Sequence, residues 1–136
     1  MMIAYIDSDV ILDVLLGRKD FAKESGQILN IVETKHLTGT TTLLALANIH
    51  YLLKRFDNKN ALKAIATLRK ILTVMPLTEQ ELINALESGF KDFEDAIQNY
   101  TSESYGCNII ITRNIKGFTK SKLPVYTPKE YLIKHC

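Results

Sequence analysis

The chain has 136 residues, which is the length of one domain and enough to bury a core of its own. Hydrophobic residues make up 46% of it and charged residues 24%, a composition typical of globular proteins that excludes a disordered chain. The formal net charge of +2 is too small to indicate a partner by itself. We predict a single domain over residues 1–136.

Membrane insertion is not expected, because no apolar run approaches the roughly 20 residues that a membrane-spanning helix needs. The first residues also lack the basic start of a signal peptide. Cys107 and Cys136 form neither a disulfide framework nor a pair with metal-binding spacing. We therefore expect reduced thiols and a cytoplasmic location.

Hydrophobic spacing predicts elements that alternate in type along the chain. Met2–Ile6 is a short continuous apolar run, suited to a strand buried on both faces, whereas Asn60–Ile71 repeats its apolar residues at helical spacing. In chain order we predict strand Met2–Ile6, helices Val10–Leu16 and Ala22–Glu33, strand His36–Thr40, helices Thr42–Arg55 and Asn60–Ile71, strand Leu72–Leu77, helices Glu79–Glu87 and Asp92–Tyr105, strands Asn108–Thr112 and Val125–Tyr126, and a C-terminal helix from Pro128.

This alternation predicts an α/β fold with a central, mainly parallel sheet of four to five short strands and helices on both faces. Ligands of such sheets bind beyond the carboxyl ends of the strands. Asp7 directly follows the first predicted strand, and Arg113 and Asn114 follow Asn108–Thr112. We therefore expect these residues at the same edge of the sheet.

Two acidic segments are candidates for metal binding. Asp7 and Asp9 lie close together after a strand, where their charges repel unless a cation or base intervenes. Asp92 and Asp95 are three residues apart, so they share a helix face. Each segment has a plainer interpretation: Asp7 or Ser8 as a helix N-cap, and the later acids as partners of a helix dipole. Together they indicate a Mg²⁺ or Mn²⁺ site, because hard cations prefer oxygen ligands.

Basic residues follow the last central strand, among them Arg113 and Lys116. Acidic segments beside basic ones suit a site that holds a cation and receives a polyanion, although each charged run alone also fits a solvated surface. The sequence contains no glycine-rich phosphate loop and no serine-nucleophile motif. These residues therefore favour a site that holds a cation and receives a polyanion.

Two segments resemble a known family. Ile6–Arg18 is similar to the opening motif of PIN domains, and Asp92–Asn114 is similar to their closing motif. The order, spacing and total length also agree, so the resemblance covers essentially the whole chain. Among PIN domains the sequence looks most like the VapC-type toxins of bacterial toxin–antitoxin pairs.

The resemblance implies a parallel-sheet nuclease that cleaves RNA with Mg²⁺ or Mn²⁺. It places the family's acids on Asp7 and Asp95 and its final Asp or Asn on Asn114. We expect those three residues and Asn48 at the catalytic centre, with Asp7, Asp95 and Asp92 as metal ligands. The residues expected to contact the RNA substrate are Ser8, Thr112, Arg113 and Lys116.

Asn48 is the main departure from the family pattern. The resemblance implies a further acid, usually Glu, on the helix Thr42–Arg55, and the matching position holds an amide. Cation affinity should fall, unless Asp92 supplies the missing charge. The chain is thus either an endoribonuclease toxin or a catalytically weakened PIN-like module that binds RNA or protein. The resemblance also implies a homodimer and an antitoxin partner.

A phosphatase of the haloacid dehalogenase type is a further alternative, because Asp7-Ser8-Asp9 also fits the phospho-aspartate motif of that family. Its chemistry needs a second acid pair directly after a strand. Here Asp92 and Asp95 precede the strand Asn108–Thr112. The order of the acids therefore argues against this alternative.

Overall fold

A computed structural model describes residues 1–136 and shows a five-stranded sheet in which every neighbouring pair is parallel. The strand order is β3-β2-β1-β4-β5, so β1 lies at the centre. The strands are β1 (Ile3–Ile6), β2 (Thr38–Thr42), β3 (Thr73–Met75), β4 (Ile109–Ile111) and β5 (Val125–Tyr126). This confirms the predicted α/β fold with its parallel sheet.

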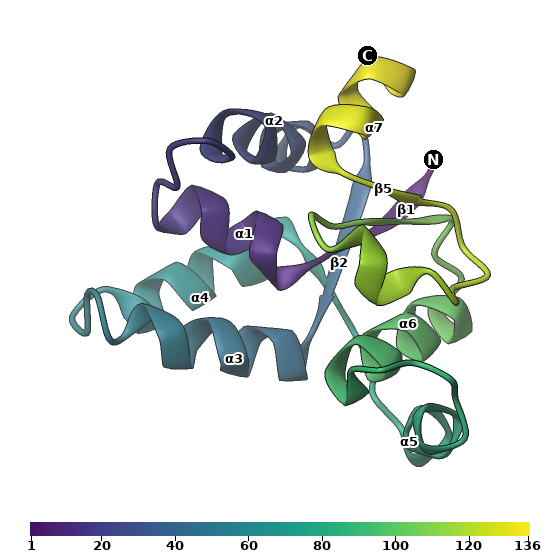
Figure 1. The fold of residues 1–136 in the computed structure, drawn as a ribbon. Coiled ribbons are helices and arrows are strands. Elements are labelled where there is room, and N and C mark those ends of the chain that lie inside the picture. Colours follow the sequence, from purple (N-terminus) through teal and green to yellow (C-terminus); the bar gives the residue numbers. More distant parts are fainter.

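Seven α-helices and one short 3₁₀-helix connect and flank the strands (Figure 1). They are α1 (Ser8–Leu15), α2 (Ala22–Glu33), α3 (Leu43–Leu53), α4 (Ala61–Ile71), α5 (Glu79–Leu86), α6 (Phe93–Tyr105), η1 (Ile115–Phe118) and α7 (Pro128–His135). None of the helices is long and apolar enough to span a membrane.

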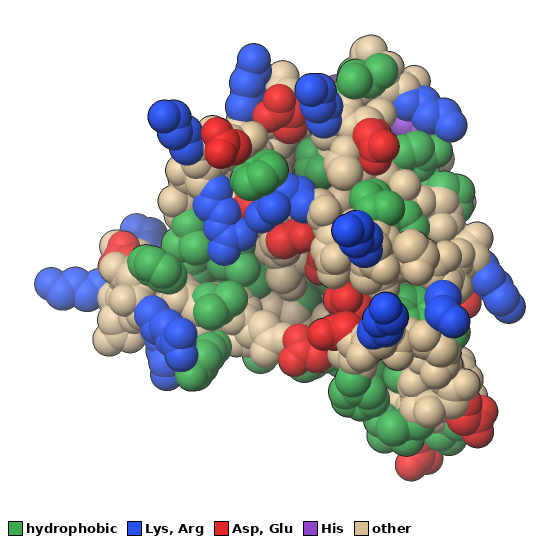
Figure 2. All heavy atoms as spheres, viewed as in Figure 1, with side chains coloured by type: hydrophobic (Ala, Val, Ile, Leu, Met, Phe, Trp, Pro, Cys, Tyr) green, Lys and Arg blue, Asp and Glu red, His purple; other side chains and the backbone are tan.

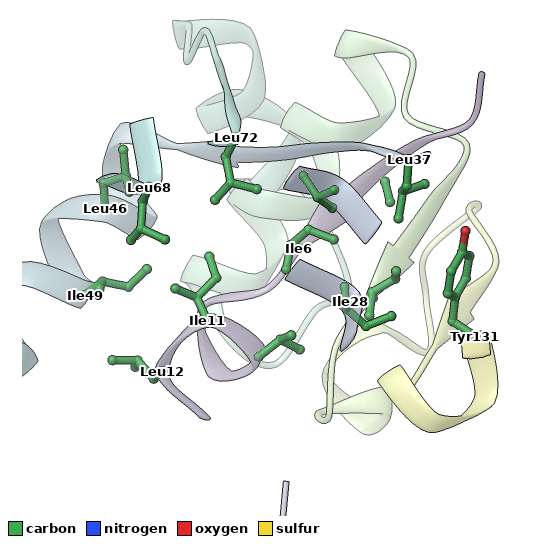
Figure 3. Close-up of a cluster of buried hydrophobic side chains, with 14 of the residues drawn as sticks. Ile6, Ile11, Leu12, Ile28, Leu37, Leu46, Ile49, Leu68, Leu72 and Tyr131 are labelled. Carbon is green, nitrogen blue, oxygen red and sulfur yellow. The ribbon is translucent and has the colours of Figure 1, made fainter. Parts of the chain in front are cut away.

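Alternate residues of the central strands face two separate apolar clusters, as the two-residue period of a strand requires. Ala4 and Ile6 belong to the larger cluster, which α1, α2, α3, α4 and α7 complete (Figure 3). Tyr5 belongs to the smaller one, with Phe118 of η1. The helices therefore cover both faces of the sheet, as predicted.

Local signals in the sequence set several helix ends. Capping boxes start α5 at Thr78 and α7 at Thr127, and Gly106 ends α6 with a left-handed φ of 94°. The N-cap of α2 is Phe21, which makes no side-chain capping bond. The helix η1 lies in a segment predicted as a basic loop.

The register of β1 and β4 brings distant residues together at the carboxyl edge of the sheet. Ile6 pairs with Ile111, so the residues that follow them, Asp7 and Thr112, leave the sheet side by side. The backbone N–H of Asp7 donates to the Ile111 carbonyl over 2.9 Å. The prediction that these two segments share one edge is confirmed.

Candidate active site

Asp7 is held at the end of β1 by three donors. Its Oδ1 accepts a 2.8 Å hydrogen bond from the Ser8 backbone N–H, which makes Asp7 the N-cap of α1. The Thr112 hydroxyl donates to Oδ2 over 2.7 Å, and the Tyr5 hydroxyl donates to Oδ1 over 3.4 Å. Asp7 is thus a helix N-cap, as the plainer interpretation has it. Its second carboxylate oxygen, however, is oriented by Thr112, which follows β4, and not by the helix.

Asp9 lies beside Asp7 and shares its neighbours. Its carboxylate accepts hydrogen bonds from the backbone N–H of Arg113 at 3.2 Å and from the Thr112 hydroxyl at 3.4 Å. Burial and then the charge of Asp9 raise the pKa of Asp7 from 3.8 to about 7. Without a cation, these two carboxylates therefore oppose each other's ionisation.

The third acid of the site is Asp95 in the first turn of α6. Burial first, and then the charges of Asp92 and Asp9, raise the pKa of Asp95 to about 6. The buried Tyr5 lies near the whole group: burial, and then the charges of Asp7, Asp9 and Asp95, raise the pKa of its hydroxyl. Acids from α1 and α6 therefore act on one another across the edge of the sheet.

Asp92 lies near Asp95, and its charge is one of the causes that raise the pKa of that acid. It is the N-cap of α6, and its Oδ1 accepts a 2.9 Å hydrogen bond from the Asp95 backbone N–H. The structure thus gives Asp92 the plainer capping role that the sequence left open. Asp9, which was not among the predicted ligands, is also close enough for its charge to raise the pKa of both Asp7 and Asp95.

Asn114 connects the end of β4 to α6. Its Nδ2 donates to Asp95 Oδ2 over 3.2 Å, and its Oδ1 accepts from the Gly117 N–H over 3.2 Å. A Cβ on Gly117 would lie 2.5 Å from Asp95 Oδ2 and would also collide with the Asn114 amide. Glycine at this position therefore keeps open a space beside two oxygen-bearing side chains.

Asn48 lies on α3 at the rim of the site. Its Nδ2 donates a 3.0 Å hydrogen bond to Glu94 Oε2 on α6. Asn48 therefore bonds to Glu94, an acid that was not among the predicted site residues. The partner in this hydrogen bond is not Asp92, the acid that was expected to supply the missing charge. The only sign in the sequence that Glu94 lies near the site is that it directly precedes Asp95.

Arg113 has a structural partner. Its guanidinium donates to both carboxylate oxygens of Asp13, over 2.7 and 2.9 Å, and it stacks on the Phe21 ring with its carbon 3.8 Å from the ring centre. Asp13 is fully buried and also accepts from Ser25 at 3.0 Å and Arg18 at 3.3 Å. Arg113 therefore has a structural role, and its contact with RNA stays a prediction.

A groove of about 520 Å³ adjoins Asp95 and is lined by positively charged side chains. Its lining includes Asn114 and the lysines Lys91, Lys116 and Lys120. Figure 2 shows acidic side chains gathered at the centre of this face with Lys and Arg side chains around them. Lys116 was predicted at the site, and the other two lysines flank the same acids.

The chemistry of these side chains fits a divalent cation. The carboxylates of Asp7, Asp9 and Asp95 offer hard oxygen ligands, while the Asn114 amide directs its Nδ2 at Asp95 and its Oδ1 at the Gly117 N–H. No three carboxylate, imidazole or thiol groups converge on one point. The carboxylates therefore suit a hard divalent cation.

Comparison with known proteins agrees with this geometry. The profile of the PIN domain family matches residues 4–116, which is most of the chain and contains Asp7, Asp9, Asp95 and Asn114. The chain belongs to the PIN-domain family. Ribonuclease VapC1 of Aquifex aeolicus (strain VF5) is 29% identical over 132 residues, covering 93% of this chain and 91% of that protein.

Solved structures share the fold at low sequence identity. VapBC2 from Rickettsia felis, bound to a DNA fragment from its promoter, superimposes with a TM-score of 0.71 at 13% identity, covering 91% of this chain and 97% of that one. A toxin–antitoxin complex from Klebsiella pneumoniae gives 0.70 at 21% identity, covering 92% and 97%. Family membership favours the nuclease interpretation over the phosphatase alternative.

Proposed function

We propose that this chain is a metal-dependent endoribonuclease, the toxin of a toxin–antitoxin pair. The observation that carries the proposal is the chain of hydrogen bonds that joins Asp7 to Asp95 through Thr112 and Asn114 at the carboxyl edge of a PIN-domain sheet. The similarity to a protein named as a ribonuclease supports RNA as the substrate. Cytoplasmic action fits the two free cysteines.

Asp7 and Asp95 would hold Mg²⁺ or Mn²⁺, with Asp9 and the Asn114 amide oxygen beside them. When bound, the cation lowers the pKa of a water molecule and offsets the charge that develops on the phosphate. The Thr112 hydroxyl fixes the direction of the Asp7 carboxylate, and Asn114 does the same for Asp95. This orientation is the part of the chemistry that the chain itself performs.

Lys91, Lys116 and Lys120 line the groove next to Asp95 and would bind the RNA phosphates on one side of the scissile bond. Ser8, at the start of α1, remains a predicted substrate contact. Arg113 also remains one, although Asp13 binds its guanidinium. The substrate path therefore runs along η1 and the start of α6.

We also propose an antitoxin partner and a homodimer. The solved structures with this fold include proteins determined as toxin–antitoxin complexes. Apolar side chains lie exposed on α5 at Leu82, Ile83 and Leu86, and on α3 at Leu43 and Tyr51. Such exposed apolar surfaces are available for protein contacts.

Cleavage of a labelled RNA with Mn²⁺ tests the function. We expect cleavage by the wild-type chain, none in EDTA, and a loss of at least about 100-fold in Asp7→Asn, because the charge that holds the cation is removed. Asp57→Asn, which removes an exposed acid in the loop before α4, is the matched control and should be fully active. Wild-type protein that cleaves no RNA, or full activity in Asp7→Asn, contradicts the proposal.

Asn48 favours a second candidate, a PIN-like module that binds RNA without cutting it. The observation is the uncharged side chain at this position of α3. Calorimetric titration with Mn²⁺ separates the two functions. A nuclease binds Mn²⁺ and cleaves, whereas the binding module retains RNA in a filter-binding assay with or without the metal.

A further inference from the structure

Glu94 and Asn48 link α6 to α3 at the rim of the candidate site. One turn further along α6, Gln98 accepts a 2.9 Å hydrogen bond from the Thr42 hydroxyl in the interior. Residues four apart share a helix face, so Glu94 and Gln98 both face α3. The buried contact joins α6 to the residue that caps α3, and the Asn48–Glu94 contact of 3.0 Å joins the same two helices at the surface.

Glu94 carries a negative charge that no cation of the chain neutralises. Both ion pairs of the structure involve Asp13, and the hydrogen-bond partner of Glu94 is an amide. An amide donor orients a carboxylate but leaves its full charge in place. The neighbouring residue Asp95 is also acidic, and the charge of Glu94 is among the causes that raise its pKa. Glu94 therefore adds to the negative potential of the site.

We propose that Glu94, oriented by Asn48, is a positioning residue of the divalent-cation site. It supplies on the α3 side of the site the charge that Asn48 does not. Glu94 lies next to Asp95 in the first turn of α6, so its charge would favour a cation held there. This inference rests on the proposed function, since Glu94 needs a cation held by Asp7 and Asp95.

Calorimetric titration of the full chain with Mn²⁺ alone tests this role. Glu94→Gln keeps an acceptor for the Asn48 amide and removes only the charge, so we expect Mn²⁺ affinity to fall about 10-fold, as for other groups that act through a metal's ligands. Glu79→Gln removes an exposed acid from the first turn of α5 and is the matched control. Its affinity should equal that of the wild type.

A second measurement uses a variant in which the negative charge is moved from α6 to α3. The double variant Asn48→Glu/Glu94→Gln places the acid on α3 and the amide on α6, and it should recover most of the lost affinity. Each variant is also scored by the rise in its own Tm on adding Mn²⁺, relative to its metal-free state. This measure remains valid for a variant that is less stable.

The outcomes separate this inference from the proposed function. Wild-type affinity in Glu94→Gln overturns the role of Glu94, while binding that is lost in Asp7→Asn leaves the nuclease proposal intact. Weak binding in Glu94→Gln without recovery in the double variant also overturns it, because the effect would then not be one of charge at this place. No Mn²⁺ binding by the wild-type chain overturns the proposed function itself.

Discussion

Replacing Asp7 by Asn should stabilise the metal-free protein. Raising the pKa of Asp7 from 3.8 to about 7 corresponds to about 4 kcal/mol of destabilisation once the carboxylate is ionised. Asn removes this charge and can keep the hydrogen bonds, accepting from the Ser8 N–H and donating to Thr112 Oγ1. We therefore expect a gain of about 2 to 4 kcal/mol at pH 8, or about 10 °C in Tm.

The sign of the pH dependence follows from the direction of the shift. Between about pH 4 and pH 7 the folded state of the wild type binds a proton at Asp7 that the unfolded state has released, so its stability falls as the pH rises. The gain in Asp7→Asn should therefore grow across this range and vanish below about pH 4.

Urea unfolding in EDTA at a series of pH values measures this gain, with Asp57→Asn as the control for loss of one negative charge. A gain that is the same at pH 4 and pH 8 would trace to packing rather than charge. No gain at pH 8 would refute the electrostatic argument. Saturating Mn²⁺ should reverse the order of the two proteins, because the cation stabilises only the chain that binds it.

Three further substitutions test the assignments. Arg113→Met leaves the buried Asp13 with weaker partners and should lower the free energy of unfolding in urea by about 3 kcal/mol, with RNA affinity of the folded protein unchanged. A selective loss of RNA affinity would instead place Arg113 at the substrate site. Gly117→Ala should weaken Mn²⁺ binding, measured by calorimetry, because its Cβ displaces Asp95, and wild-type affinity would show that the gap is unused. Lys116→Gln should raise KM with little change in kcat and lower the salt dependence of RNA binding by about 0.7 in the log–log slope; an unchanged slope would place the RNA elsewhere.

The parts of the fold that depend on local sequence were predictable. Capping boxes at Thr78 and Thr127 and the glycine at position 106 set helix ends through contacts within a few residues. The spacing of hydrophobic residues predicted whether each segment forms a strand or a helix, because the elements bury their apolar side chains against the two faces of the sheet. The shared edge of Asp7 and Thr112 followed from topology alone, since parallel strands place their carboxyl ends together.

The partners of charged side chains were less accessible from the sequence. Asp13 and Arg113 are separated by 100 residues, and their pairing depends on where α1 lies against the end of β4. The contact between Asn48 and Glu94 depends in the same way on the rotation of α3 and α6 about their axes. Such rotations are decided by packing of whole helices, which a single sequence does not display. Asp9 was recognisable as acidic, but its approach to Asp95 required the sheet to be assembled.

The pairing of β1 with β4 has a consequence for how the protein is made. The Thr112 hydroxyl that orients Asp7 is synthesised 105 residues after it. Asp95 and Asn114 also come late in the chain, on either side of β4. A growing chain therefore cannot assemble the site until β4 has been made, because the central strand must wait for its second neighbour.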